Sequence, residues 1–192
     1  MPPISMSGEK IEEVNSSWAS DENWLMMAKR VAILAVGSFN PPTIMHLRML
    51  EVARSYLEAR NVSVLEGILS PVADQFNKPS LIPSVHRLAM AEAAVRSSDW
   101  IRADGWECRR TCWTRTLDVL RHHSHEIKKK HGEDVKMMLV VGGDVVESFP
   151  CVLPDGSTLW KPDDVRRIFS GRSSQINGKV EAANRKDCDT QG

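Results

Sequence analysis

The chain has 192 residues, which is enough for one domain with a sizeable hydrophobic core. Lysine plus arginine and aspartate plus glutamate both number 25, so the formal net charge at pH 7 is zero. A general nucleic-acid-binding protein needs a basic excess to neutralise phosphates, so this balance argues against that class and requires any phosphate chemistry to be local.

The first predicted elements are a buried strand at 31–36, a turn-rich segment at 37–43 and a helix from Ile44 to about Arg60. Thr43 can cap this helix, whose apolar positions 45, 49, 52, 53, 56 and 57 recur at helical spacing. Strands and helices continue to alternate, with strands at 62–69, 100–103 and 135–141 and helices at 83–96 and 110–130. This alternation predicts an α/β fold with a doubly wound parallel sheet that helices cover on both faces.

The composition divides the chain into three segments. We expect a flexible polar leader at 1–29, a Rossmann-like domain at 30–169 and a disordered or divergent tail at 170–192, where large apolar side chains are few. The leader lacks the arginine-rich, acid-poor character of a mitochondrial presequence, and the longest apolar runs are far too short to span a bilayer. Four cysteines without a paired framework are interpreted as reduced thiols, so we expect a cytoplasmic or nuclear protein with no membrane partner.

The segment between the first strand and the first helix has the features of an anion site. A buried strand runs into Gly37, which lets a ligand approach the backbone closely, and the helix start offers unpaired N–H groups. His46 lies in the first helical turn, where its ring can donate a hydrogen bond to a phosphate oxygen. A capped helix with a partly buried histidine explains the same residues equally well. Neither Gly-x-Gly-x-x-Gly nor Gly-Lys-Ser/Thr is present, so the dehydrogenase and P-loop patterns are excluded.

Residues 37–46 are Gly-Ser-Phe-Asn-Pro-Pro-Thr-Ile-Met-His, which resembles the Gly-Ser-Phe-Asn-Pro-x-Thr-x-x-His signature of eukaryotic nicotinamide mononucleotide adenylyltransferases. That family belongs to the nucleotidyltransferases with a Thr/His-x-x-His loop on a Rossmann-like sheet. The match covers roughly 31–168 and continues in family order through 70–74, Lys78, 81–83, 86–87, 106–107, Trp113, Thr116, 119–123, 142–144, 147–149 and 159–161.

The resemblance implies that a phosphate oxygen of the mononucleotide attacks the α-phosphorus of ATP and releases pyrophosphate. The nucleophile is already an anion, so the site has to supply alignment and charge neutralisation rather than a catalytic base. The implied catalytic residues are His46 and Lys78. The implied ATP-binding residues are Gly37, Ser38, Phe39, His46, Lys78, Gly142 and Asp144. The implied mononucleotide-binding residues are Ser38, Phe39, Trp113, Thr116, Leu159 and Trp160.

Some of these residues also have an ordinary structural explanation. Lys78 can be a solvated surface lysine, and Trp113 can be a core tryptophan rather than a stacking partner of the pyridine ring. Mg²⁺ is expected on the ATP phosphates and waters, and we name no protein ligand for it. The histidines at 122–131 and the pair Cys108 and Cys112 do not form a zinc pattern, and a solvated helix end explains them better.

The chain departs from the family after Phe169. Family members continue into a Ser-Ser/Thr-x-x-Ile-Arg motif that binds ATP phosphates, and residues 173–177 (Ser-Ser-Gln-Ile-Asn) lack its arginine. We therefore expect a C-terminally truncated member with an incomplete sheet, low stability and little or no activity. Arg115 stands where family members often carry an acidic residue, so the preference between the nicotinamide and nicotinic acid forms stays open.

Two other functions stay open. One is a different nucleotidyltransferase, which uses CTP or a phosphopantetheine acceptor. The other is an inactive variant that binds nucleotide or pairs with a full-length partner. The sequence does not show the oligomeric state, so a homo-oligomer is also open.

Overall fold

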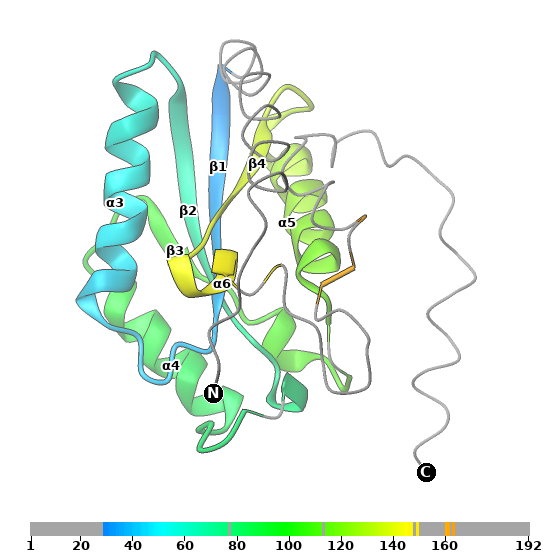
Figure 1. The fold of residues 1–192 in the computed structure, drawn as a ribbon. Coiled ribbons are helices and arrows are strands. Elements are labelled where there is room, and N and C mark those ends of the chain that lie inside the picture. The colour runs from blue at the N-terminus through cyan, green and yellow to red at the C-terminus, as the bar shows by residue number, and fades with distance from the viewer. Residues whose placement is uncertain are drawn as a thin grey trace, which may run out of the picture.

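A computed structural model of the chain describes residues 29–76, 78–112, 114–147, 149, 160, 161 and 163. Its helices and strands, shown in Figure 1, are β1 (Arg30–Gly37), α3 (Ile44–Glu58), β2 (Ser63–Pro71), α4 (Ser84–Val95), β3 (Ile101–Ala103), α5 (Thr116–His131), β4 (Lys136–Val140) and α6 (Gly143–Glu147). Two 3₁₀ turns, η1 (Asp74–Phe76) and η2 (Glu107–Arg109), follow β2 and β3. None of the helices within these ranges combines the length and the apolar character of a membrane span.

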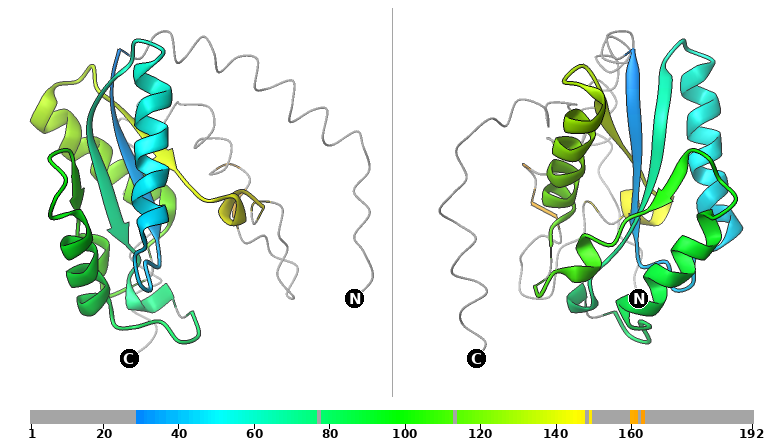
Figure 2. Two further views of the ribbon diagram at one scale, coloured as in Figure 1. Left: turned by 90° about the vertical axis from the view of Figure 1, so that its left-hand side faces the viewer. Right: turned by 180° about the vertical axis from the view of Figure 1, so that it is seen from behind.

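The strands form one parallel sheet in the order β3-β2-β1-β4. Helices α3 and α4 cover one face and α5 covers the other, as the view from behind in Figure 2 shows. The chain winds outward from β1 through β2 to β3 and then returns to place β4 on the other side of β1. This reversal confirms the predicted doubly wound α/β fold and creates a topological switch point between β1 and β4.

Strand β1 is buried along most of its length because helices lie on both sides of it. Val31, Ile33 and Ala35 pack in the cluster under α3, whereas Ala32 and Leu34 pack in the cluster under α5, and all five are 0% exposed. A strand with two buried faces needs a continuous apolar run, which is the pattern that predicted it. This burial fixes the place at which the strand ends and the following loop begins.

The apolar positions that recur at helical spacing in α3 do not all face the sheet. Leu50 and Leu57 are the buried residues of this helix, while Met45, Val52 and Tyr56 are 67%, 51% and 52% exposed. Apolar side chains stand on more than one side of α3, so periodicity alone does not choose the side that faces the sheet. Packing against β1 and β2 makes that choice.

The predicted start of α5 is also wrong. The helix begins at Thr116 rather than at Arg110, because Arg115 has an extended backbone (φ −73°, ψ 143°) that cannot continue a helix. Residues 107–109 form the separate turn η2. Thr116 is therefore the first residue of α5.

Replacing Leu50 by alanine is expected to lower the free energy of unfolding by roughly 2–5 kcal/mol, because the side chain is fully buried. Val52→Ala, on the exposed side of the same helix, is the matched control and should change that energy by about 0.5 kcal/mol or less. Urea unfolding followed by circular dichroism measures both. A loss of stability in Val52→Ala as large as that in Leu50→Ala would mean that the side of α3 that carries Val52 also packs against the sheet.

Candidate active site

The candidate site lies at the carboxyl edge of the sheet, just beyond the last paired residues of β1 and β4. Ala35 of β1 pairs with Val140 of β4, so Gly37 and Gly142 both follow two residues beyond this pair. Ligands of doubly wound proteins bind at the switch point between two such strands. The fold therefore brings the first loop (residues 37–43) and the turn that starts at Gly142 to the same edge.

Phe39 has a backbone conformation that is unusual for a bulky residue. Its φ angle is 43°, in the left-handed region, and the residue is only 3% exposed. The left-handed conformation costs on the order of 1–2 kcal/mol, which burial of the ring offsets. Backbone strain that is held by packing is typical of binding sites, where a loop has to present its N–H groups in one orientation.

His46 lies in the first turn of α3 and connects the first loop to the helix start. The Thr43 N–H donates to Nδ1 of His46 over 2.8 Å, and the Thr43 hydroxyl oxygen lies 2.9 Å from the same atom. Because Nδ1 accepts, the neutral ring carries its proton on Nε2. The ring also packs edge to face with Phe39, with 5.1 Å between centroids. His46 thus caps its helix through Nδ1, and Nε2–H is the donor of its neutral ring.

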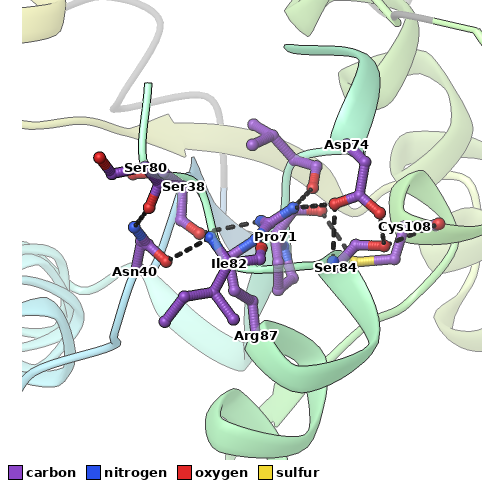
Figure 3. Close-up of polar contacts among 10 residues, drawn as sticks. Ser38, Asn40, Pro71, Asp74, Ser80, Ile82, Ser84, Arg87 and Cys108 are labelled. Atoms are coloured by element: carbon purple, nitrogen blue, oxygen red, sulfur yellow. Dashed lines mark hydrogen bonds and ion pairs between the residues drawn. The ribbon is translucent and has the colours of Figure 1, made fainter. Parts of the chain in front are cut away.

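Lys78 is exposed and lies on the second loop (residues 72–83), which joins β2 to α4. Asn40 of the first loop holds the end of this second loop through both atoms of its amide, as Figure 3 shows. Its Nδ2 donates to the Ser80 carbonyl over 2.9 Å, and its Oδ1 accepts from the Ile82 N–H over 3.0 Å. The structure therefore places the loop that carries Lys78 against the loop that carries Phe39.

Arg87 of α4 is fully buried and joins both loops (Figure 3). Its Nη1 donates to the Ser38 carbonyl over 2.9 Å, its Nη2 donates to the Val72 carbonyl over 2.7 Å, and its Nε donates to the Ile82 carbonyl over 2.6 Å. An ion pair with Asp74, at 3.0 Å, balances its charge. A buried guanidinium is tolerated only with such partners, so the position of Arg87 and the paths of the two loops depend on each other.

Asp74 links the second loop to α4. Its carboxylate accepts hydrogen bonds from the N–H of Ser84 over 2.6 Å and from the Ser84 hydroxyl over 2.9 Å. Burial raises the pKa of Asp74, but the hydrogen bonds from Ser84 and Arg87 outweigh this effect and hold the pKa below its ordinary value. The carboxylate is therefore charged at neutral pH, as the partner of Arg87 has to be.

Glu107 of η2 is a buried carboxyl group behind the second loop. Burial raises its pKa to about 8, against the hydrogen bonds from the Ser70 hydroxyl and the Ala73 N–H and against the charge of Arg87. The Ser70 hydroxyl lies at 3.4 Å, and the neighbouring Cys108 thiol donates to the Pro71 carbonyl over 3.3 Å. Glu107 is therefore a neutral acid at pH 7 and adds no negative charge beside the loops.

The sequence suggested that the histidines of α5 lie at a solvated helix end, but they do not all do so. Trp106 stacks on His122 with 4.0 Å between ring centroids and an interplanar angle of 9°. His123 is 1% exposed, and burial lowers its pKa to about 4 despite the nearby charge of Asp104. Among the described residues, no three His, Cys, Asp or Glu side chains are grouped as for a metal ion.

The structure places the other predicted site residues less completely. Gly142 follows β4, the backbone of Asp144 lies in α6, and Thr116 begins α5. Trp160 packs edge to face with Phe149, with 5.0 Å between centroids. Trp113 and Leu159 lie outside the described residues, so their roles remain predictions from the resemblance.

Sequence reasoning assigned no role to Asn40, Arg87 or Glu107. One signal was available for Arg87, because it stands at helical spacing with Ala91 and Val95 on the buried side of α4. An arginine on an apolar stripe has to find partners for its donors inside the protein. Asn40 lies inside the matched signature, but nothing in the spacing shows that its amide bonds the second loop.

The fold and the switch-point loop define a nucleotidyltransferase-type domain. The model of the cytidylyltransferase-like family matches residues 34–178, and the chain belongs to that family.

Curated relatives give a narrower comparison. The chain is 67% identical over 143 residues to nicotinamide/nicotinic acid mononucleotide adenylyltransferase 2 of Caenorhabditis elegans, covering 74% of this chain and 64% of that protein. It is 50% identical over 103 residues to nicotinamide/nicotinic acid mononucleotide adenylyltransferase 2 of Danio rerio, covering 53% of this chain and 34% of that protein. It is 42% identical over 142 residues to the rice (Oryza sativa) nicotinamide/nicotinic acid mononucleotide adenylyltransferase, covering 72% and 55%. These similarities confirm the resemblance inferred from the first loop, although the chain spans less than two thirds of each relative.

The contribution of Glu107 to the free energy of unfolding is expected to fall as pH rises from about 4.5 to about 8, because folded Glu107 holds a proton in this range that the unfolded chain has lost. Buried His123 acts in the opposite sense between about 4 and 6.5, so the net fall should appear mainly between about 6.5 and 8. Glu107→Gln removes the Glu107 titration, so the difference in free energy of unfolding between wild type and variant should shrink over the window from about 4.5 to 8. Thermal unfolding at several pH values measures the effect, and parallel curves for both proteins would contradict a neutral buried Glu107.

Proposed function

We propose that the protein transfers the adenylyl group of ATP to nicotinamide mononucleotide or nicotinic acid mononucleotide, forming NAD or deamido-NAD and pyrophosphate. The observation that carries this proposal is the first loop, which combines the family signature with a position at the switch point between β1 and β4. The names of the curated relatives support the same reaction. We further propose that the domain at 30–169 carries the activity, between the leader at 1–29 and the tail at 170–192, in the cytoplasm or nucleus.

In the proposed reaction a phosphate oxygen of the mononucleotide forms a bond to the α-phosphorus of ATP. The bond from that phosphorus to the oxygen that bridges to the β-phosphate breaks, and pyrophosphate leaves with the electron pair. No proton has to be removed from the nucleophile, so the protein contributes orientation and charge stabilisation. Nε2–H of His46, the N–H groups of Gly37, Ser38 and Phe39, and the Lys78 ammonium supply these. Mg²⁺ enters as part of the MgATP substrate, held by phosphates and water.

The remaining roles extend the resemblance. Gly142 lets ATP approach the end of β4, and Asp144 accepts a hydrogen bond from a ribose hydroxyl. The mononucleotide binds Ser38 and Phe39 together with Trp113, Thr116, Leu159 and Trp160. In this arrangement the indole of Trp113 stacks on the cationic pyridine ring, a contact worth about 1–2 kcal/mol.

The assay that tests this function measures pyrophosphate release from MgATP with each pyridine mononucleotide as acceptor. CTP with a phosphopantetheine acceptor serves as the substrate control. Release that requires ATP and a pyridine mononucleotide, even at a low rate, is the expected result. ATP binding without release would favour the inactive nucleotide-binding variant, and release with the control substrates alone would replace the proposed function by the other nucleotidyltransferase.

Replacing His46 by glutamate separates its two roles. The carboxylate can still accept from the Thr43 N–H as in a capping box, so the melting temperature should stay near that of the wild type. Its charge repels the triphosphate, so turnover should fall by roughly 100-fold or more. His46→Gln, which keeps both a cap acceptor and a donor, is the matched control and should lose less activity. Full activity in His46→Glu would contradict the assigned role of this residue.

A further inference from the structure

We propose that Asn40 and Arg87 are positioning residues that lock the second loop onto the first, so that the Lys78 ammonium and the N–H groups of the first loop meet one triphosphate. This inference rests on the function proposed above and deepens it. Neither side chain has to touch the substrate. Both act through the backbone of the two loops that bind the triphosphate. Figure 3 shows Asn40 bonded to the second loop and Arg87 bonded to both loops.

The Asn40 amide bonds one backbone carbonyl and one backbone N–H of the second loop, as the backbone of a neighbouring strand would. It donates to the carbonyl of Ser80 and accepts from the N–H of Ile82, so its two bonds enclose Leu81. Ser80 has a φ angle of 62°, in the left-handed region, so its carbonyl points in a direction that ordinary extended backbone does not give. The amide of Asn40 satisfies that carbonyl and thereby stabilises the turn.

This turn fixes the position of the Lys78 backbone. The Leu81 N–H donates to the Lys78 carbonyl over 3.2 Å, so the backbone of Lys78 is bonded to the residue that Asn40 encloses. The lysine side chain is a flexible point charge and cannot define a site by itself. Fixing its backbone reduces the conformational entropy that triphosphate binding would otherwise cost.

Arg87 orients the first loop from the other side. Its Nη1 bonds the Ser38 carbonyl, which belongs to the same peptide unit as the N–H of Phe39. In a trans peptide these two groups point in opposite directions. The bond to Arg87 therefore directs the Phe39 N–H away from the guanidinium, and in the proposed site this N–H meets a phosphate oxygen. The same guanidinium bonds the Ile82 carbonyl, so one rigid group sets both loops.

Amide hydrogen exchange of the ligand-free full chain tests the lock without any nucleotide. Asn40→Ala should speed exchange of the Leu81 N–H by about tenfold, because that bond lies within the second loop and reports its release. Gln75→Ala, an exposed change on the same loop, is the matched control and should leave this rate unchanged. Core amides of β1 should exchange alike in all three proteins. An unchanged Leu81 rate in Asn40→Ala would overturn the proposal.

A double-mutant cycle tests whether the lock acts through Lys78. Asn40→Ala should raise the KM for ATP by about tenfold and leave the KM for the mononucleotide within about twofold of the wild type. In the Lys78→Ala background the same change should add less than about twofold. Effects that multiply independently, or a loss equal for both substrates, would mean that Asn40 does not position Lys78.

A conservative variant of the buried arginine completes the test. Arg87→Lys keeps the charge beside Asp74 but loses the planar fork. It should therefore raise the KM for ATP in addition to any decrease in the melting temperature. A drop in stability with an unchanged KM would reduce Arg87 to a structural residue and overturn its part in the proposal. A wild-type chain that fails to bind ATP would overturn the proposed function, and the exchange result would still decide whether the lock exists.

Discussion

The Arg87 guanidinium lies in the protein interior, with its donors directed at the carbonyl oxygens of Ser38, Val72 and Ile82. Breaking a buried charged network by removing one partner costs about 3–5 kcal/mol, so these carbonyls must be in place when α4 packs against the sheet. Two loops that are far apart in the sequence are thereby held in one arrangement. Every proposed contact with ATP phosphate before β4 lies on one of these loops or on the helix turn that follows the first.

The electrostatics of the site fit a protein without net charge. Asp74 balances Arg87, so the buried cation organises the loops without adding free positive charge. Burial keeps Glu107 protonated, and a carboxyl group that would repel a triphosphate is neutral at pH 7. In the proposed function, the attraction for phosphate then comes from Lys78, the donor of His46 and the N–H groups at the start of α3. These are local features, which a count of lysines and arginines does not show.

Much of the fold and part of the site could be predicted from the sequence. The continuous apolar run of β1 and the capped start of α3 are local patterns, and they located the first loop and its histidine. The inner face of α3 and the start of α5 could not be predicted, because the first depends on packing and the second on the extended backbone of Arg115. The bonds from Asn40 to Ile82 and from Arg87 to Ser38 join residues 42 and 49 positions apart, and no periodicity encodes such contacts.

In the proposed function, the two loops form one preorganised site for the triphosphate at the switch point of the sheet. Titration of the ¹⁵N-labelled full chain with MgATP, followed by NMR, tests it most directly. The amide resonances of Phe39 in the first loop, of His46 in the first turn of α3 and of Leu81 in the second loop should shift together. Their titration curves should give a single dissociation constant. Shifts confined to one loop, separate dissociation constants, or changes only at a distant cationic surface such as 128–130 would contradict the account.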